Sequence, residues 1–99
     1  MKVKLPKKMK IGNKWFEIEH RHEIIDPHTK KPDVMGVVNY KLKRMRIAHN
    51  YPAAEVRNTF WHETIHAILE DMGHELCENE RFVTAFANRL SDAIDSAKF

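Results

Sequence analysis

Hydrophobic and polar residues alternate with a period of two along residues 15–25. Because successive side chains of a strand point to opposite faces, this pattern predicts a β-strand. Two shorter segments, residues 36–40 and 45–49, are separated by a polar turn and predict two further strands. Between the first and second strand, residues 26–33 contain two prolines and predict a loop. On the first strand, one side carries Phe16, Ile18, His20, His22 and Ile24, and the other carries Trp15, Glu17, Glu19, Arg21 and Glu23.

The spacing of apolar residues changes after Pro52. From residue 53 to residue 72 it follows the turns of a helix, and Gly73 is a natural C-terminal stop. A second helix is predicted to begin near residues 78–80, with Asn79 as its cap. Three strands followed by two helices predict an α+β fold, in which a small three-stranded sheet packs against two antiparallel helices.

The composition fits one soluble domain covering residues 1–99, with 42% hydrophobic and 31% charged residues. No apolar run approaches the roughly 20 residues of a membrane span, and the N-terminus lacks the apolar core of a secretory signal. The single cysteine, Cys77, rules out an internal disulfide and a Cys-rich zinc site. We therefore expect a cytoplasmic location, and any metal must be held by histidine and carboxylate.

The net charge of +3 comes largely from lysines in the first 14 residues. These are Lys2, Lys4, Lys7, Lys8, Lys10 and Lys14. A basic arm of this kind can bind nucleic acid or another anionic surface. We favour a solvated, partly frayed terminus instead, and do not expect nucleic acid or a membrane to be the partner.

The predicted first helix carries the sequence His62-Glu63-Thr64-Ile65-His66, the HExxH pattern. Residues at i and i+4 lie on one helix face, so both imidazoles can reach one metal ion. Zinc takes histidine nitrogens, and a catalytic zinc site uses three protein ligands plus a water. Glu63 can act as general base toward that water and then pass the proton to the leaving amine. The competing interpretation is two surface histidines on a solvated helix face.

A third protein ligand must come from downstream of the motif. The candidates are Glu70, His74, Glu75, Glu78 and Glu80. Glu80 opens the second helix at a distance that lets the chain turn back toward the motif, and we select it, with Glu78 second. Glu70 is expected to be exposed, and His74 is too close behind His66 for the HExxHxxGxxH pattern.

The stretch F-W-H-E-T-I-H-A-I-L followed by N-E-R-F-V-T-A-F-A resembles the gluzincin-type zinc metallopeptidases. It is most similar to the compact ImmA/IrrE-like peptidases and to small, minigluzincin-like metallopeptidases of phages and mobile elements. The resemblance implies a minimal zincin-like core in which His62, His66 and Glu80 bind zinc and Glu63 is the general base. It also implies that residues 36–38 and 45–48 form the hairpin whose edge strand holds an extended peptide.

Two features depart from that family pattern. Thr84 stands where such enzymes often have an acidic or amide residue that orients a histidine. No residue is singled out to stabilise the oxyanion, for which the candidates are Tyr40, Tyr51, His74 and Arg81.

The sequence thus predicts a zinc metallopeptidase (a hydrolase) that cleaves a peptide or protein substrate. The alternative is a non-catalytic or latent metal-binding protein that binds nucleic acid or an acidic partner through its lysine-rich N-terminus. His20 and His22 have the spacing of a metal-ligand pair on a strand, but we favour a partly buried structural role for them. We assign no role to His28 or His49.

Overall fold

The computed structural model describes residues 3–99, so Lys2 of the basic cluster lies outside the described residues. Four strands precede two helices: β1 (Lys8–Ile11), β2 (Lys14–Arg21), β3 (Gly36–Asn39), β4 (Arg44–Ala48), α1 (Ala53–Asp71) and α2 (Glu80–Ser96). The chain is α+β, but the predicted sheet of three strands is wrong because the sheet has four. The additional strand, β1, lies within the lysine-rich segment that we expected to be frayed.

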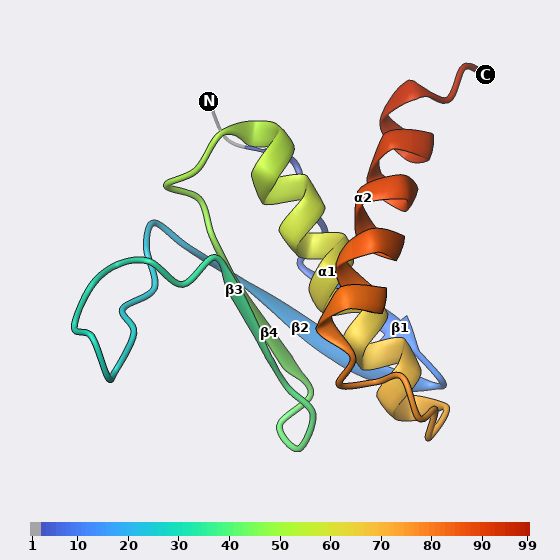
Figure 1. Ribbon diagram of the computed structural model, residues 1–99, viewed down its shortest axis with the longest axis horizontal. Coiled ribbons are helices and arrows are strands. Elements are labelled where there is room, and N and C mark those ends of the chain that lie inside the picture. Colours follow the sequence, from blue (N-terminus) through green and yellow to red (C-terminus); the bar gives the residue numbers. More distant parts are fainter. Residues whose placement is uncertain (1–2) are drawn as a thin grey trace.

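The sheet is mixed, with the strand order β1-β2-β4-β3 (Figure 1). β1 pairs antiparallel with β2, β2 pairs parallel with β4, and β3 pairs antiparallel with β4. β2 ends at Arg21, four residues before the predicted end, and the chain then enters the long loop that leads to β3. Strand β3 comes last in the strand order and therefore lies at an edge of the sheet.

The two helices are antiparallel and lie on the same side of the sheet (Figure 1). Helix α1 contacts the sheet, whereas α2, among the described elements, packs only on α1. The expectation that both helices pack on the sheet is therefore wrong for α2. One core cluster joins the sheet to α1 and includes Ile18, Met45, Ile47, Val56 and Phe60. A second joins α1 to α2 and consists of Ile65, Leu69, Val83 and Ala87.

The ends of the helices are formed as the sequence predicts. Gly73, just after α1, has a φ of 64° that few side chains tolerate, and the next amide donates to the carbonyl of Leu69. Asn79 caps α2, with its side-chain oxygen accepting a hydrogen bond from the amide of Phe82 at 2.9 Å. The short turn between these caps brings the start of α2 back alongside the middle of α1. Among the described residues, neither helix is long and apolar enough to cross a membrane.

Candidate metal centre

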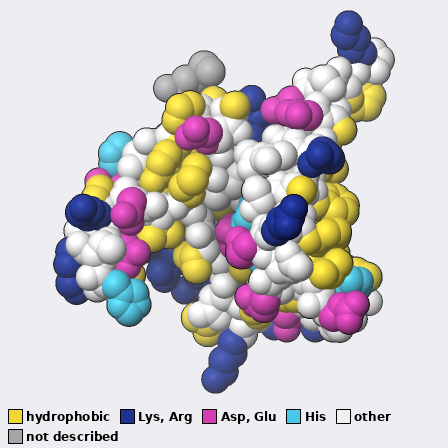
Figure 2. Space-filling model, viewed as in Figure 1, with side chains coloured by type: hydrophobic (Ala, Val, Ile, Leu, Met, Phe, Trp, Pro, Cys, Tyr) yellow, Lys and Arg dark blue, Asp and Glu magenta, His cyan; other side chains and the backbone are white. Residues whose placement is uncertain are grey.

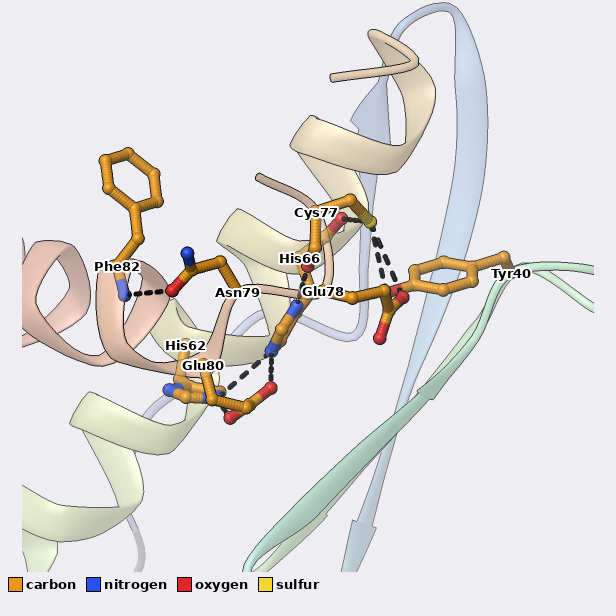
Figure 3. A network of polar contacts seen from close by, with 8 residues as sticks. All are labelled: Tyr40, His62, His66, Cys77, Glu78, Asn79, Glu80 and Phe82. Atoms are coloured by element: carbon orange, nitrogen blue, oxygen red, sulfur yellow. Dashed lines mark hydrogen bonds and ion pairs between the residues drawn. The ribbon is translucent and has the colours of Figure 1, made fainter. Parts of the chain in front are cut away.

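Three predicted metal ligands come together where the first turn of α2 meets the middle of α1. The ligand atoms of His62, His66 and Glu80 all lie within 4.8 Å of one another. The two Nε2 atoms of the histidines are 3.2 Å apart. The Glu80 carboxylate places Oε2 3.1 Å from His62 Nε2 and Oε1 2.6 Å from His66 Nε2 (Figure 3). Helical spacing on α1 and the cap of α2 together produce this convergence.

A backbone carbonyl fixes the orientation of the His66 ring. The Nδ1 atom of His66 lies 2.6 Å from the carbonyl oxygen of Cys77, and because a carbonyl only accepts, Nδ1 must donate (Figure 3). The neutral ring then presents its Nε2 lone pair to the centre of the cluster. Metal-bound histidines usually have such a partner on the other ring nitrogen. The partner of Nδ1 is thus the main chain at Cys77 and not the hydroxyl of Thr84.

The cluster fits a divalent cation. The His66 lone pair and a carboxylate oxygen of Glu80 face each other at 2.6 Å, and two acceptors that close repel each other unless a proton or a metal ion lies between them. Tetrahedral zinc with bonds of about 2.0–2.1 Å separates its ligand atoms by about 3.3 Å. The separations of 2.6 to 3.2 Å in the cluster would widen by less than about 1 Å to reach that value.

Burial favours the neutral, metal-binding form of His62. It lowers the pKa of His62 below 6.5, although the nearby Glu80 carboxylate works in the opposite direction. The side chain of His66 is only 6% exposed, whereas that of Glu80 is 67% exposed. The cluster is therefore closed on the α1 side and open to solvent on the α2 side.

The cluster forms one wall of a pocket of about 360 Å³, within the size range of small-ligand sites. In Figure 2 a hollow between the sheet edge and α2 contains acidic and histidine side chains. The edge strand β3, the motif on α1 and the start of α2 all contribute to the pocket. The lining residues are Gly36, Val37, Val38, Tyr40, His62, Glu63, His66, Glu78 and Glu80.

Glu63 lines this pocket beside the ligands. Burial raises the pKa of its carboxyl group to about 7, while nearby His66 acts to lower it and nearby Glu80 to raise it. A carboxylate with a pKa near neutrality is suited to accept and return a proton. The edge strand approaches it closely, because a Cβ atom added at Gly36 would lie 3.3 Å from Cγ of Glu63. The absence of a side chain at Gly36 thus leaves space beside the predicted base.

The pocket also distinguishes among the candidates for the third metal ligand and for the oxyanion donor, between which the sequence did not decide. Glu78, our second choice for the third ligand, lines the pocket but does not belong to the three-residue cluster. Of the four oxyanion candidates, Tyr40 lines the pocket and the other three do not. Its hydroxyl lies 3.8 Å from Sγ of Cys77, and burial, followed by this contact, raises the pKa of Tyr40 above its usual value (Figure 3). The hydroxyl therefore stays protonated and can donate.

His20 and His22 take no part in the cluster and are exposed rather than partly buried. His20 Nδ1 lies 2.8 Å from Nε2 of His49, and its Nε2 lies 3.2 Å from the carbonyl oxygen of Pro6. His49, to which we assign no role from the sequence, thus contacts the histidine that binds the segment before β1. Three features of the site had no sequence signal that we identified: the Cys77 carbonyl, the close approach at Gly36 and the selection of Tyr40.

Comparison with protein-family models, with curated proteins and with solved structures found no match to this chain.

Proposed function

We propose that this protein is a zinc-dependent metallopeptidase. The observation that carries the proposal is the convergence of His62, His66 and Glu80 beside Glu63 in one open pocket. Two neutral imidazoles and one carboxylate are a ligand set typical of catalytic zinc, which keeps a further position open. A cytoplasmic location is part of the same proposal.

His62, His66 and Glu80 would hold the zinc ion, with the His66 ring kept in place by the Cys77 carbonyl. The bound ion supplies Lewis-acid chemistry, which activates water for attack on a carbonyl at neutral pH. Glu63 takes the proton from the attacking water at its carboxylate and returns it to the amine that leaves. Its burial supports this role because the carboxyl group can change protonation state near neutrality.

Tyr40 is the residue that we propose donates a hydrogen bond to the carbonyl oxygen as negative charge develops on it. It lines the same pocket, and the raised pKa of its buried hydroxyl keeps the donating proton in place. The peptide substrate is proposed to lie along β3, whose unpaired edge faces the pocket and can pair with an extended chain. Tyr40 follows β3 directly, so one segment of chain would both hold the substrate and supply the donor.

The test compares Glu63→Gln with a matched variant, Glu70→Gln, in zinc-loaded protein. Glu70 is exposed on the same helix and does not line the pocket. Cleavage of a mixture of quenched fluorescent peptides of random sequence is the readout, and zinc content is measured in parallel. We expect Glu63→Gln to abolish cleavage with zinc content unchanged, and Glu70→Gln to cleave like the wild type. Cleavage by Glu63→Gln at the wild-type rate would overturn the proposal, and zinc binding with no cleavage by the wild type would identify a non-catalytic metal-binding protein.

A further inference from the structure

The face of the sheet opposite the helices is open. Helix α1 packs on one face, and no described element packs on the other. The strand pairing places alternate residues on this open face, in neighbouring positions across the strands. They are Lys8 and Lys10 on β1, Trp15, Glu17, Glu19 and Arg21 on β2, Val37 and Asn39 on β3, and Arg44, Arg46 and the buried Ala48 on β4.

Positive charge is concentrated on this open face. It carries five basic residues (Lys8, Lys10, Arg21, Arg44 and Arg46) and two acidic ones (Glu17 and Glu19). The excess of three positive charges on the face equals the net charge of the whole chain. The positive charge of the face therefore comes from residues on three strands of the sheet, and not from the N-terminal lysine cluster alone.

Three arginines share a single carboxylate at the centre of the open face. Glu19 Oε1 lies 3.0 Å from Nε of Arg44, and Glu19 Oε2 lies 3.0 Å from Nη2 of Arg21 and 3.4 Å from Nε of Arg46. The Arg44 contact is short but is not aligned as a hydrogen bond. One carboxylate neutralises only one of the three guanidinium groups, each of which carries several N–H donors. The cluster therefore keeps its attraction for a further anion.

An aromatic ring accompanies the charges at one end of the open face. Trp15 is 54% exposed, and the Nζ atoms of Lys8 and Lys10 lie 5.0 and 5.5 Å from the centroid of its ring. A large exposed indole can stack on a flat ring of a ligand. The lysine ammonium groups beside it can then contact a negatively charged group of the same ligand.

A shallow hollow of about 110 Å³ lies at the other end of the open face. Its lining combines two guanidinium groups and an amide with two exposed apolar side chains, and consists of Val37, Asn39, Leu42, Arg44 and Arg46. Neighbouring strands are about 4.8 Å apart, so the β1 lysines and the β4 arginines lie on the order of 10 Å from each other. Trp15, on β2, lies between them in the strand order.

We propose that the open face binds single-stranded nucleic acid, with a base stacked on Trp15 and phosphates held by Arg44, Arg46 and the β1 lysines. A positively charged surface with an exposed aromatic ring is the usual platform for a single strand, because every base has a face that can stack. An acidic peptide matches the charge but offers no regular flat ring to Trp15. The binding face lies on the opposite side of the sheet from α1, and none of the residues proposed to contact the nucleic acid is a metal ligand or Glu63.

The test uses a fluorescein-labelled oligothymidylate of about 12 nucleotides, a length that covers a typical single-strand site. Fluorescence anisotropy gives its affinity for the full chain at 50 and 200 mM salt, and circular dichroism checks that each variant is folded. The double variant Arg44→Gln/Arg46→Gln removes two charges from the face. Its matched control, Lys30→Gln/Lys31→Gln, removes two charges from the exposed loop between β2 and β3.

We expect affinity to fall as salt rises, and the arginine variant to bind about tenfold more weakly with a salt slope reduced by about 1.4. The loop control should stay within about twofold of the wild type. Trp15→Leu should lose about tenfold in affinity and Trp15→Phe should retain most of it, because a phenyl ring can still stack.

Equal losses in the arginine variant and the loop control would overturn the proposal, as would unchanged binding in Trp15→Leu. Tighter binding to polyglutamate or to anionic phospholipid vesicles than to the oligonucleotide would overturn it in favour of those partners. Zinc content measured on the same samples should be unchanged throughout, so that the result is independent of the metal site.

Discussion

Replacing Glu63 by glutamine should stabilise the metal-free protein at alkaline pH. Burial raises the pKa of this carboxyl group from 4.5 to about 7, so ionising it costs the folded state about 3 kcal/mol. Below pH 4.5 the Glu63 carboxyl group is protonated in both the folded and the unfolded state, so it does not lower the free energy of unfolding. As the pH rises from 4.5 through 7, the unfolded state ionises before the folded state does, and the free energy of unfolding falls. Glutamine has nearly the same shape and never ionises. The variant should therefore differ from the wild type by less than about 1 kcal/mol near pH 5, where ionisation in the unfolded state has only begun, and exceed its free energy of unfolding by about 3 kcal/mol at pH 8.5.

Urea unfolding in the presence of a chelator, followed by circular dichroism at the two pH values, measures this difference. Glu70→Gln is the control, because Glu70 is exposed on the same helix and its replacement should change the pH dependence little. A Glu63→Gln variant with the same stability as the wild type at pH 8.5, or a lower one, would refute the reasoning. A gain of this size would show that the chain retains a carboxylate at a position where its charge destabilises the fold, as functional sites often do.

Three further predictions follow from particular contacts. Gly36→Ala should destabilise the protein by about 1–3 kcal/mol in urea unfolding, because the new Cβ atom would lie 2.6 Å from Cγ2 of Thr59. Adding Thr59→Ser removes that methyl group and should recover part of the lost stability. Equal stability of the single and double variants would contradict this cause. Asn79→Ala should cost about 1 kcal/mol of thermal stability through loss of the α2 cap, whereas an unchanged melting temperature would show that the cap contributes nothing. Zinc affinity measured by calorimetric titration should be nearly constant above about pH 7, because burial lowers the pKa of His62 below 6.5 and keeps it neutral there. Affinity should fall in more acidic solution, where His62 binds a proton in place of the metal, and affinity that is constant down to about pH 4 would exclude ligation by His62.

The helices and the arrangement of the motif could be predicted because their signals are local. The spacing of His62 and His66 places them on one face of any helix that contains them. The Asn79 cap and Gly73 then limit the turn between the helices, which leaves Glu80 as the first residue of α2. Each of these inferences depends on residues close together in the sequence.

The sheet was harder to predict because its pairing is not local. Strand β1 has basic residues at Lys8 and Lys10, which face solvent, so its apolar signal rests on Met9 and Ile11 alone. The parallel pairing of β2 with β4 joins segments separated by the long loop and β3, and nothing in the alternation of residues distinguishes that order from a simple meander. The open basic face could not be recognised for the same reason, since Arg44 and Arg46 join the β1 lysines only through this strand order.

The pocket combined predictable and unpredictable parts. Glu63 follows from the motif, but the carbonyl of Cys77 that orients His66 belongs to the main chain, which has no residue-specific signal. Gly36 and Tyr40 reach the pocket only because β3 is the edge strand. Selection of Tyr40 from among the oxyanion candidates therefore required the fold.

The most direct test of the central claim, a metal ion held by His62, His66 and Glu80, is the zinc content per chain after dialysis against a weak chelator. Elemental analysis of the wild type should give about one zinc ion per chain. Glu80→Ala should lose nearly all of this zinc, whereas Glu78→Ala, which changes a pocket residue outside the cluster, should keep it. Full zinc content in folded Glu80→Ala, or its loss in Glu78→Ala alone, would contradict the account.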